Sequence, residues 1–312
     1  MRPCQGKKGK AKNMIRKVFT AIAVLLLITA CSGQKDLQKQ KPVIFVSIPS
    51  QAYFLEKLAG ERFQIEIMVR AGESPATYEP RPRQVQKLSE ARFFFTVGVP
   101  FEEAWVPRLK SRFPSLSVVD TTAGIRKRAV ETAHDIFPKD KKHEEGHGHG
   151  LKDPHVWLSP RLAKQMVKNI AEALIQDDPE KASSYKERRD TLLYELTLLQ
   201  KEIRVILDEG EPQPFAVFHP SWGYFCDEFG LVQIPIEIAG REPAPREMTS
   251  LVALLRSKGV KSVIIQKEFS AHAAKAIAKA LEADVILLEP LGRDYPELLR
   301  EAARAVSKRG AP

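Results

Sequence analysis

Short apolar runs of strand length recur along this chain, with helical patterns between them. In the first half these runs are Pro42–Ile48, Phe63–Val69, Ala91–Val97 and Leu116–Val119. In the second half they are Phe215–Phe218, Leu231–Ile236, Ser262–Ile265 and Val285–Leu288. Strands that alternate with helices favour a mostly parallel sheet covered by helices on both faces. The sequence therefore predicts an α/β fold with two such sheets.

Serine residues mark where several of the intervening helices begin. Ser50 precedes a helical pattern that ends near Gly60, and Ser270 precedes another that ends at Leu281. Ser159 stands directly before Pro160, a residue favoured in the first turn of a helix. Because a serine hydroxyl can accept a hydrogen bond from a free backbone N–H at a helix start, we expect these three serines to be N-caps.

One segment between the two sets of strands is unusually long and helical. Its apolar residues lie on one stripe: Tyr185, Leu192, Leu196, Leu199, Ile203 and Ile206. Core packing alone explains such a stripe, but the length is also enough to cross one domain and reach another. We therefore predict a rigid linking helix over residues 179–209, between an N-terminal lobe (42–178) and a C-terminal lobe (210–312).

The first thirty residues have the features of a secretory signal. They carry seven Lys or Arg and no acidic residue, and they end in an apolar run too short to span a bilayer. Ile28–Cys31 resembles the processing box of bacterial lipoproteins, which implies cleavage before Cys31 and a lipid on its sulfur. The alternative is an ordinary signal peptide. Translation can start at Met1 or at Met14, and residues 31–41 are polar enough to be a tether.

Removal of this signal peptide changes the net charge and the number of cysteines of the mature protein. Without its seven basic residues, the 49 Lys and Arg exceed the 39 Asp and Glu by only about three. The basic balance of the whole chain is thus no argument for nucleic-acid binding, and we expect none. Cys4 is removed and Cys31 is lipidated, so Cys226 alone remains and a disulfide framework is excluded. We interpret Cys226 as a small buried apolar side chain.

A histidine-rich stretch interrupts the strand and helix pattern. His143, His147 and His149 lie among Glu, Lys and Gly residues, and nothing nearby can bury an apolar face. We therefore expect a mobile surface loop over residues 141–152. Imidazole is a common metal ligand, so this loop is predicted to capture metal ions transiently, although a solvated polar loop is the simpler alternative.

Three potential metal ligands fall at comparable places in the pattern. His155 lies on a loop stiffened by Pro154, while His219 and Glu289 each follow directly after a predicted strand. In open parallel sheets, ligands bind beyond the carboxyl ends of the strands, so two lobes that face each other would bring these residues to one cleft. Two imidazoles and a carboxylate form a plausible site for a divalent metal.

Five phrases of the sequence carry a family resemblance. They are Ser74–Pro80, Asp153–Pro160, Phe218–Phe225, Arg241–Pro245 and Leu288–Gly292, in that order. With these phrases the chain resembles the zinc- and manganese-type solute-binding proteins of bacterial ABC transporters, from about Val43 to the last helix. The resemblance implies two α/β lobes joined by a long helix, with one metal ion held between them. It also implies that the histidine-rich insertion lies beside this cleft, a feature linked more often to zinc.

The resemblance assigns ligands residue by residue, with one gap. The second and third histidine ligands of the family fall on His155 and His219, and its carboxylate falls on Glu289, where aspartate is more usual. The first histidine is replaced by Ala76, which has no donor atom, and its neighbours Glu73 and Thr77 are not at the family position. A tetrahedral zinc site needs a fourth ligand besides these three. That ligand is a water molecule or a histidine such as His147, His149 or His272, unless metal binding has weakened.

The function we expect is therefore metal capture, not catalysis. A lipid-anchored, monomeric receptor on the periplasmic or cell-surface side would bind Zn²⁺, or else Mn²⁺ or Fe²⁺, and deliver it to an ABC-type permease. An adhesion or scaffold lipoprotein that kept the fold and lost the metal is one alternative. A zinc hydrolase is another, because two histidines and a glutamate can leave a position open for water, but no predicted helix carries a His-Glu-x-x-His motif, since the His-Glu-Glu-Gly-His of residues 143–147 falls in the predicted loop.

Overall fold

The computed structural model describes residues 41–131, 152–210, 213–238, 240–267 and 271–307. The chain divides into a short unit that ends at Lys41 and a larger unit, Pro42–Pro312, to which all the described helices and strands belong. The predicted signal peptide, most of the tether and Cys31 lie outside the described residues, as do His143, His147 and His149. Among the described helices, none has the length and apolar composition needed to cross a membrane.

The first sheet has four parallel strands in the order β2-β1-β3-β4. Their bounds are Val43–Val46 for β1, Gln64–Ile67 for β2, Ala91–Thr96 for β3 and Ser117–Asp120 for β4. Each strand overlaps the apolar run that predicted it, so these four predictions are confirmed. The connections contain helices α2 (Pro49–Ala59), α3 (Pro82–Leu88) and α4 (Pro100–Arg112).

The second sheet repeats the same parallel arrangement, in the order β6-β5-β7-β8. Its strands are β5 (Phe215–Val217), β6 (Gln233–Pro235), β7 (Ser262–Ile265) and β8 (Asp284–Leu287). Its helices are α8 (Gly223–Phe229), α9 (Pro245–Ser257), α10 (Ala271–Leu281) and α11 (Tyr295–Val306). The predicted α/β class with two mostly parallel sheets is confirmed. In each sheet the chain order reverses beside the first strand, and such a switch point is where α/β folds place ligands.

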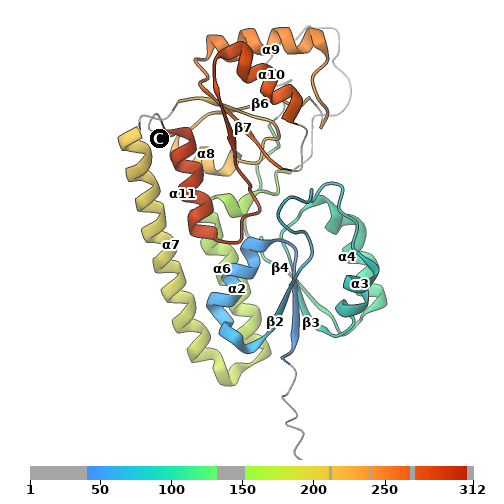
Figure 1. The fold of residues 1–312 in the computed structure, drawn as a ribbon. Helices are drawn as coiled ribbons and strands as arrows, with labels where there is room; N and C mark the ends of the chain where they lie inside the picture. Colours follow the sequence, from blue (N-terminus) through green and yellow to red (C-terminus); the bar gives the residue numbers. More distant parts are fainter. Residues whose placement is uncertain (1–40, 132–151, 211–212, 239, 268–270, 308–312) are drawn as a thin grey trace, which may run out of the picture. The chain divides into compact units, whose positions relative to one another are not determined.

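Two long helices connect the sheets. Helix α6 (Pro160–Asp177) begins with the predicted cap, because Ser159 Oγ accepts a hydrogen bond from the backbone N–H of Leu162 at 3.2 Å. After a short 3₁₀ turn at Pro179–Lys181, helix α7 (Ala182–Gly210) occupies the predicted linking segment. Figure 1 shows α7 alongside α6, α11 and α2, with which it makes contacts. The predicted apolar stripe is the face that it buries against them.

The prediction for Ser50 is wrong. Helix α2 begins at Pro49, so Ser50 lies inside its first turn and cannot cap it. The cap is supplied by Gln51, whose side-chain oxygen accepts hydrogen bonds from the N–H groups of Ser47 (2.9 Å) and Ile48 (3.2 Å). The longer side chain reaches back over the helix start, as in a capping box. The predicted cap Ser270 lies outside the described residues, although its helix, α10, is present.

A single hydrophobic cluster contains residues from both sheets, among them Ile44 and Phe94 of the first and Phe215 and Val217 of the second. Trp157 lies fully buried in this cluster, and two hydrogen bonds fix it there. Its indole N–H donates to the carbonyl of Pro290 at 2.9 Å, and its own carbonyl accepts from the Tyr295 hydroxyl at 2.7 Å. The loop that carries His155 is thus tied to the loop that carries Glu289, and Trp157 is a core residue.

Helix α7 offers a matched test of this packing. Leu196 is 2% exposed and Leu198 is 45% exposed, two residues apart on the same helix. We expect Leu196→Ala to lower the free energy of unfolding by about 2–5 kcal/mol, because it removes buried methyl groups and leaves a cavity. Leu198→Ala should change it by no more than about 0.5 kcal/mol. Urea unfolding of both variants checks this, and equal losses would contradict the packing of α7.

Glu102, in the first turn of α4, is a buried carboxyl group at the end of β3. Its carboxylate accepts hydrogen bonds from the backbone N–H groups of Val97 (2.9 Å) and Gly98 (2.7 Å). Burial nevertheless dominates and raises the pKa of Glu102 to about 7. Because the folded state holds the proton more tightly than the unfolded state, this group stabilises the fold most below the unfolded pKa, near 4.3. That contribution is lost as the pH rises through about 7.

We therefore expect the free energy of unfolding to carry a falling component between about pH 4.5 and pH 7, with a slope of up to about 1 kcal/mol per pH unit. Glu102→Gln should remove this component, since an amide does not titrate. Glu103→Gln, at the neighbouring exposed position, is the matched control and should keep it. The measurement is denaturant unfolding at several pH values, and an unchanged slope in Glu102→Gln would refute the assignment.

Candidate metal centre

His155 is held by the acidic residue two positions before it. The Asp153 carboxylate accepts a hydrogen bond from the backbone N–H of His155 at 2.9 Å and lies 2.7 Å from His155 Nδ1. Burial lowers the pKa of His155, although Asp153 opposes this change, so the ring favours its neutral form. Because a carboxylate can only accept, Nδ1 carries the proton and the lone pair is on Nε2. The ring is therefore prepared to bind a metal ion through Nε2.

His219 is held in the same way by a residue from a neighbouring strand. It follows β5 at the switch point of the second sheet, and Glu237 follows β6. The backbone N–H of Glu237 donates to the carbonyl of Phe218 at 3.1 Å, which extends the strand pairing up to the site. His219 Nδ1 then lies 2.8 Å from the Glu237 carboxylate. A carboxylate thus orients this second imidazole through Nδ1, as Asp153 does for His155.

The structure brings these two histidines together, although 63 residues separate them in the chain. Their ring centroids are 5.3 Å apart, and the ring planes meet at 69°. Each ring has a carboxylate on Nδ1, and both side chains are mostly buried. Two imidazoles, each oriented by a carboxylate, therefore lie close together, and imidazole nitrogen is a donor that transition-metal ions accept.

Glu289 lies nearby in the fold but does not complete a three-ligand set in this structure. It follows β8, and one of its oxygens accepts a hydrogen bond from the N–H of Leu291 at 3.1 Å. Burial raises the pKa of Glu289, while the N–H groups of Leu291 and Gly72 and the Lys267 charge oppose the shift. Its other oxygen, Oε2, is buried without a hydrogen-bond partner. Within the described part of the chain, no three His, Cys, Asp or Glu side chains converge closely enough to hold a metal ion.

The residues around the missing family ligand, and the auxiliary ligand His272, are not part of the histidine pair. Ala76 and Thr77 are exposed, and the Glu73 carboxylate is engaged by the Arg70 N–H (2.9 Å) and the Arg81 guanidinium (2.6 Å). His272 lies exposed on α10. Cys226 is buried, as predicted, and its burial raises the pKa of its thiol.

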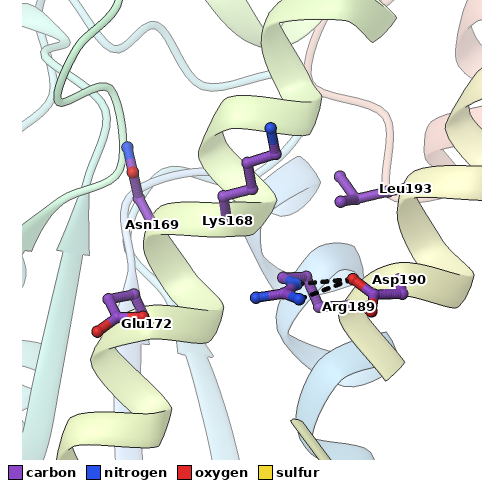
Figure 2. Close-up of a pocket in the computed structure, with 6 residues that line it drawn as sticks. All are labelled: Lys168, Asn169, Glu172, Arg189, Asp190 and Leu193. Atoms are coloured by element: carbon purple, nitrogen blue, oxygen red, sulfur yellow. Dashed lines mark hydrogen bonds and ion pairs between the residues drawn. The ribbon is translucent and has the colours of Figure 1, made fainter. Parts of the chain in front are cut away.

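A separate groove of about 510 Å³ lies between α6 and α7. It is lined by Lys168, Asn169, Glu172, Arg189, Asp190 and Leu193 (Figure 2). Arg189 and Asp190 form an ion pair at 2.8 Å, so part of its charge is already neutralised internally. None of the predicted metal ligands lines this groove, and its mixed charges give it no evident selectivity for an ion.

Sequence reasoning missed the two carboxylates that orient the histidines. Asp153 is part of the phrase that singled out His155, but its role depends on a contact that the sequence does not display. Glu237 follows the run that ends at Ile236, just as His219 and Glu289 follow their strands. The rule that selected those two residues could therefore have selected Glu237 as well.

The chain matches a family model described as "Zinc-uptake complex component A periplasmic" (ZnuA) over residues 44–309. The zinc-binding protein AdcA of Streptococcus pyogenes is 27% identical, and the match covers 93% of this chain and 60% of AdcA. The chain thus spans only about 60% of the length of these streptococcal relatives. The high-affinity zinc uptake system protein ZnuA of Bacillus subtilis is 25% identical over 88% of each protein.

Comparison with solved structures gives the same family. A crystal structure of ZnuA is 35% identical and has a TM-score of 0.74, covering 84% of this chain and 96% of that one. A laminin-binding protein of Streptococcus agalactiae, 21% identical with a TM-score of 0.72, shares the fold. Because the family model spans most of the chain, the conclusion is direct: this chain belongs to the ZnuA family of periplasmic zinc-uptake components.

Proposed function

We propose that this protein is an extracytoplasmic receptor that binds a transition-metal ion, zinc in preference to manganese or iron, and delivers it to an ABC-type permease. The observation that carries the proposal is the pair His155 and His219, whose ring centroids lie 5.3 Å apart in an edge-on arrangement, with a carboxylate on each Nδ1. Membership of a zinc-uptake family and the likeness to proteins named for zinc binding support it. That family is one of uptake components, not of enzymes.

The ligands that we propose are Nε2 of His155, Nε2 of His219 and the carboxylate of Glu289. The buried Oε2 of Glu289 has no partner, and a buried acceptor without one is costly, so a cation there would satisfy it. The hydrogen bond from Trp157 to the carbonyl of Pro290 holds this loop against the His155 loop. Glu289 would join the two histidines once its carboxylate turns toward the bound ion.

The donor types favour zinc. Imidazole suits zinc, whereas manganese prefers oxygen ligands, and the affinity of a given site for divalent metals rises along the series from manganese toward copper and zinc. A site with two imidazoles and one carboxylate is therefore expected to favour zinc over manganese. Replacing the usual aspartate by Glu289 keeps the charge of the site and changes the reach of the side chain.

The fourth ligand is the point at which this chain departs from its family. Ala76 has no donor atom, so we propose that a water molecule or a histidine of segment 132–151, such as His147 or His149, takes this place. A site with fewer protein ligands holds its ion less tightly and releases it more readily. Such a site suits a carrier that must give the ion up to a permease.

We also propose that the mature protein is a monomer anchored by a lipid on Cys31, facing the periplasm or the cell surface. The leader sequence and the periplasmic character of the family support this placement. The adhesion alternative is less well supported, because the oriented histidine pair is intact, whereas the laminin-binding neighbour shares only the fold. The hydrolase alternative is less well supported, because the family to which the chain belongs is one of zinc-uptake components.

Removal of either histidine tests the ligand assignment. We expect His155→Ala and His219→Ala to weaken zinc binding at least ~10–100-fold, the range found when only an outer partner of a ligand is lost. His272→Ala, on the exposed face of α10, should leave the affinity unchanged. Calorimetric titration of the metal-free proteins measures this. If His272→Ala weakened binding as much as the other two, His272 would be a ligand and the pair would not explain the site.

Restoring the missing family histidine tests the proposed gap. We expect Ala76→His to tighten zinc binding by about tenfold or more, equivalent to about 1.4 kcal/mol, because it supplies a fourth donor. Thr77→His places the same imidazole one residue along the chain and is the matched control. Competition with a fluorescent zinc chelator gives both affinities. Equal affinities in the two variants would show that position 76 does not face the bound ion.

A further inference from the structure

Both ends of segment 132–151 join in a short stem that reaches the two histidines. Ala129 and Lys152 form an antiparallel bridge, and the N–H of Asp153 donates to the carbonyl of Arg128 at 2.9 Å. We call residues 128–131 and 152–153 the stem. One of its residues, Asp153, is the carboxylate that orients His155, so the stem and the candidate site share a side chain.

Tyr224 of helix α8 fastens the two strands of the stem to each other. Its hydroxyl accepts a hydrogen bond from the N–H of Arg128 at 2.9 Å and donates one to the carbonyl of Asp153 at 2.9 Å. The side chain is buried, and burial raises the pKa of Tyr224 to about 12, so the hydroxyl remains a donor. The Arg128 guanidinium lies over the Tyr224 ring and pairs with Asp227 of the same helix at 3.2 Å.

Little space remains between Gly223, at the start of α8, and the stem. A Cβ atom on Gly223 would lie 2.4 Å from Arg128 Nη1 and 3.1 Å from an Asp153 carboxylate oxygen. A larger residue at this position would therefore displace the Arg128 guanidinium and crowd the Asp153 carboxylate. The Asp153 oxygen near Gly223 is Oδ2, whereas Oδ1 is the oxygen that contacts His155.

The other strand of the stem is connected to the His219 loop. Glu131 pairs with Arg128, and its second oxygen accepts a hydrogen bond from the side-chain amide of Gln233 at 2.8 Å. The oxygen of the same Gln233 amide accepts from the N–H of Trp222 at 3.1 Å. Gln233 is 5% exposed and thus bridges the stem and the backbone just beyond His219.

We propose that the stem, fastened by Tyr224 and Gln233, is a positioning device that sets the spacing and orientation of His155 and His219. This inference rests on the proposed metal-binding function. One strand of the stem acts on His155 through Asp153, and the other acts on His219 through Gln233. A change that displaces the stem should therefore alter the metal affinity of the histidine pair. By linkage, metal binding at the pair should alter the position of the stem.

Tyr224→Phe in the full-length chain is the test, because it removes one hydroxyl and keeps the ring. We expect zinc affinity, measured by chelator competition, to fall about tenfold, the lower end of the range for outer partners of a metal ligand. The visible absorption of the Co²⁺-loaded protein should also change in intensity, since it reports ligand geometry. Tyr185→Phe is the matched control: that hydroxyl is also buried and accepts a hydrogen bond from Arg62 at 2.6 Å, away from the stem.

Glu131→Ala is a second variant, chosen because this side chain is one-third exposed and its loss is tolerable for folding. We expect it to weaken zinc binding and alter the Co²⁺ spectrum in the same direction, whereas Glu195→Ala, which breaks the exposed ion pair with Lys57, should do neither. If the wild-type protein binds zinc and both stem variants bind it equally with the wild-type Co²⁺ spectrum, the positioning role is wrong. If the wild-type protein does not bind zinc, the proposed function itself fails.

Discussion

The candidate site depends on one repeated interaction, a hydrogen bond between a buried carboxylate and the Nδ1 atom of a histidine. Asp153 makes it with His155, and Glu237 makes it with His219. Each bond fixes the orientation of the ring, and the Nε2 atoms of the two rings are the donors that we propose for the ion. Without these carboxylates the imidazoles could rotate. Fixing their orientation when the metal binds would then cost conformational entropy and weaken the binding. The remaining features of the site are arranged around this pair.

Two hydrophobic clusters hold the pair: Trp157, near His155, belongs to the first, and Phe218, next to His219, belongs to the second. Residues of both sheets belong to one hydrophobic cluster, and Trp157 is hydrogen-bonded to Pro290 and Tyr295 inside it. The same strand order in both sheets places His219 at a switch point, where the carboxyl ends of parallel strands leave room for a ligand. Ligand-bearing loops anchored in a packed core are expected to shift little when an ion binds or leaves.

Much of the fold could be predicted from the sequence, because buried parallel strands are continuous apolar runs that need no long-range information. The Ser159 cap and the apolar stripe on α7 were also predictable, because each depends only on residues close together in the sequence. The predicted Ser50 cap was wrong because helix α2 already starts at Pro49, and Gln51 supplies the cap. His219 was singled out by its place after a strand, His155 by its place on a loop stiffened by Pro154, and both by the family phrases. Their carboxylate partners were not, since Glu237 is 18 residues from His219 and only strand pairing brings them together. The ligand roles of His155, His219 and Glu289 stay proposals.

The central claim is that one metal ion binds between His155 and His219. The most direct measurement is anomalous diffraction at the zinc absorption edge from crystals of the zinc-loaded protein. The account predicts a single strong peak at about 2.0–2.1 Å from Nε2 of both histidines, the usual distance between zinc and imidazole nitrogen. A zinc peak elsewhere, with the two rings still bound only to Asp153 and Glu237, would contradict it.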